Sequence, residues 1–309
     1  MSGDARPADF LDDGGLARLR EFARRARVEI VRAIDHAKGG HLGGPLSAAD
    51  LLTALYFHEM RIRPDEPDWL ERDRFILSKG HSSIGLYAVM ALRGYFPVAE
   101  LLTFDASDSR LQGHPDMTRL PGLDMSTGSL GMGISAALGI ALGAKIDGRD
   151  VRAYVMLGDG ECQEGEVWEA AHVAQRYQLD NLVAIIDHNK LQQYGWQGAT
   201  GSERLAPYQG TELLDRWSAF GWHVIEIDGH DMPAIVGAFD RAREVQGKPV
   251  ALLAHTVKGK GISFMEDRYF WHTRIIKPDE FAQAMRELGE PAEEGSNGSA
   301  QPVPAGARP

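Results

Sequence analysis

Two strand-like segments in the middle of the chain each end in residues that could bind a ligand. Val151–Leu157 runs into Gly158-Asp159-Gly160, and Leu182–Ile186 runs into Asp187-His188-Asn189. Both segments are short and largely apolar, as buried parallel strands are. The carboxyl ends of parallel strands open on the same edge of a sheet, where α/β folds bind ligands. One carboxylate and one amide are therefore expected to lie close together.

Three interpretations of the glycine turn around Asp159 compete. The turn could be purely structural, with an acidic residue at a helix start. A dinucleotide fingerprint fails, because Gln163 stands where the third glycine of G-x-G-x-x-G is needed. A divalent cation is the third interpretation, since Asp159 and Asn189 offer hard oxygen ligands of the kind that Mg²⁺ takes. Such a cation would offset three acidic neighbours that repel a bare diphosphate: Glu161, Glu164 and Glu166.

Two glycine segments could supply backbone amides to an anion at this site. A helix is expected directly behind Gly160, with apolar residues at helical spacing from Val167 to Ala174. The N-terminus of a helix attracts phosphate groups. A second glycine loop, Gly128 to Gly133, also opens a helix and could cradle the same anion.

Four histidines in loops form a second candidate group. His41, His81 and His114 each lie beside glycine or proline, and His272 follows Trp271. Each one alone fits a structural histidine, but together they could bind hydroxyl groups and move protons near neutral pH. The remaining histidines have no such context and are expected to be structural. So is Cys162, because no partner for a nucleophile is placed near it in the sequence.

Composition narrows the class of protein. The chain has 309 residues, 43% of them hydrophobic, and a formal net charge of -11. That charge argues against non-specific nucleic-acid binding. No membrane-spanning run and no secretory leader are expected. A single cysteine suits a reducing compartment, so we expect a cytoplasmic protein.

The elements that position these groups alternate between helices and short strands. We expect an α/β fold with a doubly wound, mostly parallel sheet and helices on both faces. Residues 14–288 should form a single domain, flanked by a flexible stretch at 1–13 and a disordered Gly/Pro/Ser/Ala-rich tail at 289–309. The expected helices are Leu16–Ala37, Ser47–His58 (with Ser47 and Asp50 as a capping box), one after His81, one from Gly133 to about Lys145, and Met232–Gln246. The further expected strands are Arg74–Ser78, Trp222–Ile227 and Val250–Val257.

The order of these motifs resembles the transketolase family. The Gly-Asp-Gly turn followed by Asn189 resembles the thiamine diphosphate signature, and other motifs match in the family's order over about residues 15–275. They are Gly39-Gly40-His41, Lys79-Gly80-His81, Gln112-Gly113-His114-Pro115, Thr127-Gly128-Ser129-Leu130-Gly131, Asp228-Gly229-His230-Asp231, Lys258-Gly259-Lys260-Gly261 and Trp271-His272. Two departures concern substrate contacts: Lys79 replaces a frequent asparagine, and Leu42-Gly43-Gly44 replaces a proline-containing stretch.

The resemblance implies a cofactor, a metal and a role for each matching residue. Thiamine diphosphate would be bound with Mg²⁺, for which Ca²⁺ or Mn²⁺ could substitute. The metal ligands would be Asp159, Asn189 and the Leu191 carbonyl. The cofactor contacts would be His81, Gly128, Ser129, Leu130, Gly158, Gly160, Asn189, Lys258 and His272. The catalytic residues, binding sugar hydroxyls and moving protons, would be His41, His114 and His272. Glu164 and Glu169 match acidic residues that lie between the two active sites of a dimer.

The resemblance also implies a partner, because family enzymes are longer and carry a pyrimidine-binding domain after this one. That domain supplies the glutamate that activates the aminopyrimidine. We therefore expect the N-terminal subunit of a split transketolase, which would assemble with a C-terminal subunit into an α2β2 heterotetramer and act on sugar phosphates. Three alternatives stay open: an enzyme like deoxyxylulose phosphate synthase, a transketolase for an unusual sugar, and a non-catalytic subunit that binds the cofactor.

Overall fold

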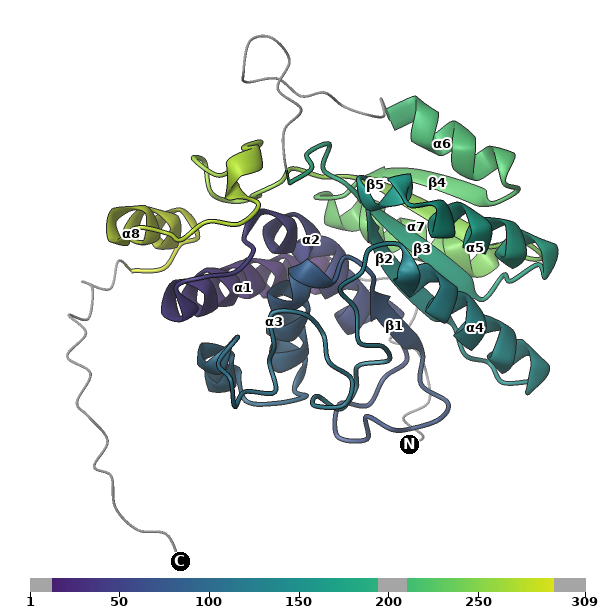
Figure 1. Cartoon of the computed structure of the whole chain (residues 1–309), viewed down its shortest axis with the longest axis horizontal. Helices are drawn as coiled ribbons and strands as arrows, with labels where there is room; N and C mark the ends of the chain where they lie inside the picture. Colours follow the sequence, from purple (N-terminus) through teal and green to yellow (C-terminus); the bar gives the residue numbers. More distant parts are fainter. Residues whose placement is uncertain (1–12, 194–209, 292–309) are drawn as a thin grey trace, which may run out of the picture.

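The core of the protein is a five-stranded parallel sheet. The computed structural model describes residues 13–193 and 210–291 (Figure 1). The strand order is β1-β2-β3-β5-β4, and neighbouring strands are parallel throughout. The strands are β1 (Arg74–Leu77), β2 (Ala153–Gly158), β3 (Leu182–His188), β4 (His223–Asp228) and β5 (Val250–His255). The register pairs Gly158 with Asp187, so the two predicted ligand-bearing strand ends lie side by side.

Helices cover both faces of this sheet, which confirms the doubly wound fold (Figure 1). Alternate residues of β2 separate the two cores: Tyr154 and Met156 pack in one hydrophobic cluster, whereas Val155 and Leu157 pack in the other. The first cluster includes residues of α1 (Asp13–Ala37), α2 (Gly43–Ala54), α3 (Ser83–Arg93) and α7 (Met232–Glu244). The second includes residues of α4 (Met132–Ile146), α5 (Gly165–Arg176) and α6 (Gly210–Ala219).

The predicted start of α2 is wrong. The helix begins at Gly43, four residues before Ser47, and its N-cap Leu42 makes no side-chain cap bond. Ser47 lies inside the helix, where its hydroxyl bonds the Gly44 carbonyl at 2.9 Å and a carboxylate oxygen of Asp187 at 2.7 Å. A glycine is needed at position 44, because a Cβ there would lie 2.7 Å from Ser82 Oγ. Close packing, and not a cap, therefore sets this helix start.

Short π-helical and 3-10 segments precede or follow several of the helices. A π-helix, Leu55–Glu59, continues α2. The helix expected directly behind Gly160 is instead a 3-10 turn, Glu161–Gln163, followed by α5 from Gly165. Further 3-10 turns are Gly80–Ser82, Val98–Thr103 and Tyr269–Trp271. The chain therefore continues from Gly160 into a 3-10 turn and not into the first turn of α5.

The sequence patterns did not predict α6 or α8 (Pro278–Glu287), and they set the terminal boundaries too far inward. Asp13 already belongs to α1. The chain after α8 is held to α1, because Arg24 donates to the Leu288 carbonyl at 2.5 Å and pairs with Glu290 at 3.0 Å. The predicted tail therefore cannot begin at residue 289. Residues 1–12 and 292–309, which carry the rest of both terminal predictions, lie outside the described residues. In the part of the chain that the structure describes, no helix is both long and apolar enough to cross a bilayer.

Candidate functional site

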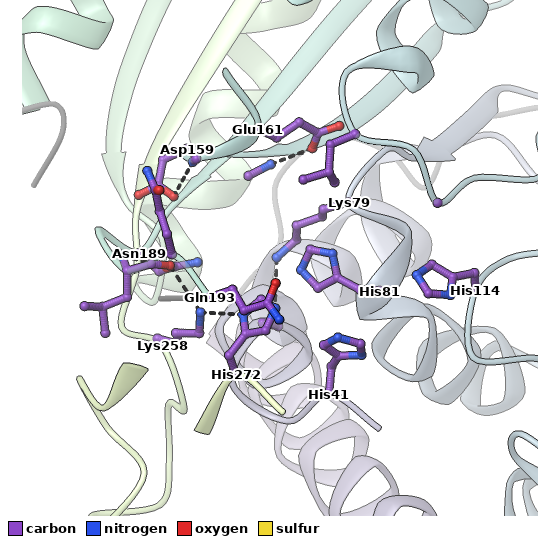
Figure 2. Close-up of a pocket in the computed structure, with 17 residues that line it drawn as sticks. His41, Lys79, His81, His114, Asp159, Glu161, Asn189, Gln193, Lys258 and His272 are labelled. Carbon is purple, nitrogen blue, oxygen red and sulfur yellow. Dashed lines mark hydrogen bonds between the residues drawn. The ribbon is translucent and has the colours of Figure 1, made fainter. Parts of the chain in front are cut away.

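A cavity of about 780 Å³ opens at the carboxyl edge of the sheet, where the predicted ligand residues meet (Figure 2). Its wall includes residues from β2, from the segment after β3, from the loops beyond β1 and β5, and from the glycine loop before α4. These segments are far apart in the sequence. The parallel arrangement of the strands brings them to one edge, as α/β sheets do for their ligands.

Three oxygen-bearing groups converge on one corner of this cavity. Asp159 accepts hydrogen bonds from the amides of Gly160 at 2.8 Å and Lys190 at 2.6 Å. The Leu191 amide donates to Asn189 Oδ1 at 3.2 Å. Lys190 has a left-handed backbone, with φ of 64°, which turns the chain so that its own amide meets Asp159. Asp159, Asn189 and Leu191 all line the cavity.

The charge of Asp159 is poorly compensated by the protein itself. Burial and the nearby Asp187 carboxylate raise the pKa of Asp159 from 3.8 to about 6. Among the described residues, Asp159 forms no salt bridge. A divalent cation would neutralise this carboxylate, and a carboxylate, an amide oxygen and a backbone carbonyl are ligands that Mg²⁺ accepts. The residues present therefore fit the predicted metal. Within the described ranges, no group of three or more His, Cys, Asp or Glu side chains could hold a metal ion, so the fit rests on the mixed set of one carboxylate, one amide oxygen and one backbone carbonyl.

Asp187 lies behind this corner and fixes the orientation of Asn189. Asp187 is fully buried and accepts hydrogen bonds from Ser47, Thr256 and Lys79. Burial acts to raise its pKa, but the Lys79 ammonium and the hydrogen bonds outweigh burial and hold the pKa below its ordinary value. Asp187 also accepts from Asn189 Nδ2 at 3.0 Å. The amide nitrogen of Asn189 is thus engaged, which leaves Oδ1 as the atom available to a cation.

Glu161 is a buried residue of the cavity wall, and its carboxylate bonds residues of three segments. Its carboxylate accepts from the Gly131 amide at 2.9 Å, the Gly158 amide at 3.0 Å and the Ser78 hydroxyl. Desolvation raises its pKa despite these bonds. The Glu161 carboxylate is therefore held by the glycine loop and by Ser78, and its repulsion of a bare diphosphate stays a prediction.

The four predicted histidines form one cluster. The ring centroid of His41 lies 5.1 Å from that of His81, 6.3 Å from that of His114 and 5.1 Å from that of His272 (Figure 2). Burial, together with nearby positive groups, lowers the pKa of His41 to about 4, that of His81 to about 2 and that of His272 to about 3. These three imidazoles are therefore neutral at pH 7, and each has one nitrogen that donates and one that accepts a hydrogen bond.

Lys258 contacts both the histidine cluster and the corner formed by Asp159, Asn189 and Leu191. Its ammonium lies 3.1 Å from the Leu191 carbonyl and 2.8 Å from His272 Nδ1 (Figure 2). Burial lowers the pKa of Lys258 to about 8, so the amine remains largely protonated at pH 7. A protonated amine must donate, which makes His272 Nδ1 the acceptor and places the His272 proton on Nε2.

Nearly all of the predicted site residues line this single cavity. They are His41, His81, His114, Gly128, Leu130, Gly158, Asp159, Gly160, Asn189, Leu191, Lys258 and His272. Ser129 is exposed and is not among the lining residues, so its role stays a prediction. Glu164 and Glu169 are exposed near the start of α5, and their predicted role also stays open. Cys162 is buried, and its burial raises the pKa of the thiol well above the ordinary value, as expected of a structural cysteine.

Five lining residues had not been predicted as members of the site: Gly44, Lys79, Glu161, Gln192 and Gln193. For Lys79 and Glu161 the decisive contacts are with residues distant in sequence, and no local pattern indicates them. Gln192 and Gln193 directly follow the predicted ligand Leu191, and that position could have indicated them.

Comparison with known proteins assigns this cavity to a family. Residues 19–296 match the family model described as transketolase, thiamine diphosphate binding domain. The chain belongs to the transketolase family. The fold and the match together establish that the cavity lies in a thiamine diphosphate-binding domain of that family.

Relatives of two lengths resemble this transketolase domain. One is the 6-deoxy-6-sulfo-D-fructose transketolase subunit SqwG of Clostridium sp. (strain MSTE9), 45% identical over 87% of this chain and 96% of the relative. Another is an apulose-4-phosphate transketolase subunit from Phocaeicola vulgatus, 41% identical over 87% of this chain and 92% of the relative. Transketolase of Rattus norvegicus is 41% identical over 93% of this chain but only 44% of the relative. This chain thus matches the two subunits over nearly their whole length.

Solved transketolase structures share the fold. Transketolase from Pichia stipitis in complex with sedoheptulose 7-phosphate has a TM-score of 0.81 and 33% identity, covering 89% of this chain and 41% of that one. Transketolase from Campylobacter jejuni has a TM-score of 0.80 and 31% identity, with 89% and 43% coverage. The chain therefore spans less than half the length of these solved transketolases.

Proposed function

We propose that this chain binds Mg²⁺ and the diphosphate end of thiamine diphosphate, as one subunit of an enzyme that transfers a two-carbon ketol unit from a ketose to an aldose. One observation supports the proposal most strongly, and it concerns which residues line the cavity. The three oxygen ligands and four histidines meet in a single cavity, in a chain of the transketolase family.

The metal corner would hold the charged end of the cofactor. Asp159, Asn189 Oδ1 and the Leu191 carbonyl would bind Mg²⁺ or a substitute such as Mn²⁺ or Ca²⁺. Around the phosphates and rings, the contacts would come from His81, Gly128, Ser129, Leu130, Gly158 and Gly160. When bound, thiamine diphosphate supplies an electron sink that permits the bond beside a carbonyl carbon to break.

The histidines would bind the sugar and move its protons. His41, His114 and His272 line the cavity, and neutral imidazoles can donate to and accept from sugar hydroxyls. Because Lys258 donates to His272 Nδ1, His272 presents Nε2–H as a donor to a hydroxyl or carbonyl oxygen. His41 is neutral at pH 7, so its ring has an acceptor nitrogen for a sugar hydroxyl, and we assign it a part in moving the proton of that hydroxyl.

The reactive end of the cofactor would depend on a second chain. The two relatives described above are named as subunits of transketolases, which supports a partner chain. We propose that this partner carries the pyrimidine-binding domain and that the two chains form an α2β2 heterotetramer. The sugars would be phosphorylated or otherwise acidic, since those relatives are named for a sulfonated fructose and for apulose 4-phosphate. We assign the recognition of that acidic group to the partner.

The test is reconstitution. This chain, co-expressed with a candidate chain that carries a pyrimidine-binding domain, should transfer ketol units only when thiamine diphosphate and Mg²⁺ are present. A panel of ketoses, including sulfonated and phosphorylated sugars, would be assayed by mass spectrometry of the products. Failure of the assembled complex on every ketose would refute the transketolase proposal.

A transketolase for an unusual sugar is the variant of this proposal that the relatives favour. The same panel separates it from an enzyme of central sugar metabolism, because a sulfonated or apulose-type donor would be used in preference to xylulose 5-phosphate. Formation of deoxyxylulose phosphate from pyruvate would instead place the protein with the deoxyxylulose phosphate synthases.

A further inference from the structure

The side-chain amide of Gln192 is a buried hydrogen-bond donor that lacks an acceptor. Gln192 follows the predicted metal ligand Leu191 and lines the cavity. Its Nε2 atom is buried and, within the described part of the chain, meets no acceptor. Buried donors are rarely left unpaired in proteins, because they lose their bonds to water without replacement. An unpaired donor on a cavity wall therefore indicates an acceptor that arrives with a ligand.

The position of Gln192 shows where that ligand group would lie. A Cβ built on Gly160 would lie 3.0 Å from Gln192 Cγ, 3.2 Å from Cδ and 3.3 Å from Nε2. The Gln192 side chain thus packs against Gly160, in the space that a side chain at position 160 would need. Gly160 in turn donates its amide to Asp159 Oδ1 at 2.8 Å. The free donor is consequently next to the corner formed by Asp159 and Leu191.

The protein's own acceptors in this corner already have donors. Each carboxylate oxygen of Asp159 accepts a backbone amide, from Gly160 and from Lys190. The Leu191 carbonyl accepts from Lys258 at 3.1 Å. Each of these oxygens could accept a further bond, but none pairs with Gln192 Nε2 in the described part of the chain, so a ligand bound at this corner is the natural source of the missing acceptor. Phosphate oxygens are charged and are strong acceptors of such bonds.

We infer that the Gln192 carboxamide donates a hydrogen bond to the diphosphate of the cofactor. This inference rests on the proposed function, since it needs a diphosphate at the Asp159 corner. It makes Gln192 a residue that binds the phosphates through its side chain, which matters because the amides of Gly131, Gly158 and Gly160 are already bonded to carboxylates of the protein.

The test compares side-chain variants by calorimetry on the full-length chain with two probes. The probes are thiamine diphosphate and inorganic diphosphate, each with Mg²⁺. Gln192→Met keeps the length of the side chain but removes the donor, so both dissociation constants should rise about 10-fold. Gln192→Glu places a second anion beside the diphosphate and should weaken both probes further. Gln283→Met is the matched control, because Gln283 lies on α8 and donates to Glu287; its affinities should equal the parent's.

A second readout separates binding from folding. Removal of an unpaired buried donor should leave the thermal midpoint of the free Gln192→Met chain unchanged or higher. Parent-like affinity of Gln192→Met for both probes would overturn the inference. A loss of affinity accompanied by a fall in the thermal midpoint would also overturn it, because the loss would then reflect unfolding and not a missing hydrogen bond. If the parent itself binds neither probe, the proposed cofactor site fails. Parent binding with an unaffected variant refutes the role of Gln192 alone.

Discussion

At the scale of single residues, the buried pair of Lys79 and Asp187 supports the metal corner. Lys79 is 2% exposed and Asp187 is 0% exposed, and the two form a salt bridge. Because Asp187 also holds the amide of Asn189, the pair links the interior of the sheet to the ligand that faces the cavity. An ion pair at such depth is costly to break, since one partner is left charged and desolvated.

A double-mutant cycle tests this pair. Lys79→Met and Asp187→Asn should each lower the free energy of unfolding by about 3–5 kcal/mol. The double variant should lose less than the sum, because no unpaired charge remains. Urea denaturation followed by circular dichroism gives the three values. Strict additivity would show that the two groups do not interact.

The histidine cluster makes a prediction about protonation. Because burial lowers the pKa of His41 to about 4, that of His272 to about 3 and that of His81 to about 2, these imidazoles should stay neutral above pH 5. In the unfolded chain they protonate below their ordinary pKa of about 6.5. The unfolded state therefore binds more protons, and these groups make the fold less stable as the pH falls from 7. The measurement is an NMR pH titration of the histidine signals in the free chain. A signal from any of the three that titrates near pH 6.5 would contradict the prediction.

At the scale of elements, the N-terminus of α4 is packed tightly against the end of β1. A Cβ on Gly133 would lie 2.5 Å from Ser78 Cβ and Oγ, whereas a Cβ on Gly139 in the same helix meets nothing within 4 Å. Ser78 cannot give way freely, because its hydroxyl contacts Glu161 and accepts from the Gly133 amide at 3.1 Å.

Two alanine substitutions in α4 should therefore have opposite effects. Gly133→Ala should destabilise the protein by about 1–3 kcal/mol through overpacking. Gly139→Ala is the matched control and should stabilise it by about 0.5–1 kcal/mol, because alanine has the better helix propensity and is less free in the unfolded chain. Thermal denaturation measures both. A stabilising Gly133→Ala would show that β1 and α4 are not in this contact.

Asp50 joins α1, α2 and the turn after β4 through charge. Its carboxylate bonds Arg27 at 3.1 Å and His230 at 2.8 Å. Burial acts to raise the pKa of Asp50, but Arg27 and His230 together lower it from 3.8 to about 2. The folded-state pKa is depressed, so the stability that Asp50 contributes is present above pH 4 and is lost as the pH falls toward 2.

The acid sensitivity of an Asp50→Asn variant tests this link. Between pH 5 and pH 3 the parent should lose more free energy of unfolding than the variant, by about 1 kcal/mol. Urea titrations at several pH values supply the comparison. Equal losses in the two proteins would show that Asp50 titrates normally.

The sequence predicted those parts of the fold and site that depend on local pattern. The apolar runs of β2 and β3 and the polar residues after them placed Asp159 and Asn189 together, because parallel strands end at the same edge. The start of α2 was mispredicted because a Ser-x-x-Asp pattern can arise inside a helix when buried glycines set its beginning. α8 was missed although Pro278 and Glu280 at its start are a recognisable signal. The inward carboxylates of Asp187 and Glu161 depend on long-range packing, which no local pattern encodes.

At the scale of the whole molecule, the ligand-binding residues gather at one edge of a sheet that helices cover on both faces. The cavity lies where the loops after β1, β2, β3 and β5 meet, while the N-terminal helices and α4 to α6 lie on either side of the sheet (Figure 1). The described lining carries two lysines, and both have partners: Lys79 pairs with Asp187, and Lys258 contacts Leu191 and His272. Neither lysine of the described lining is therefore without a partner inside the protein.

The most direct test of the account is calorimetric titration of the chain with thiamine diphosphate in the presence and absence of Mg²⁺. The parent should bind the cofactor in a strictly Mg²⁺-dependent manner, and Asp159→Ala should raise the dissociation constant at least about 100-fold, since a metal ligand is lost. Asp147→Ala, at an exposed position after α4, should bind as the parent does. Equal affinity of Asp159→Ala and the parent, or binding that does not depend on Mg²⁺, would contradict the assignment of the metal–diphosphate site.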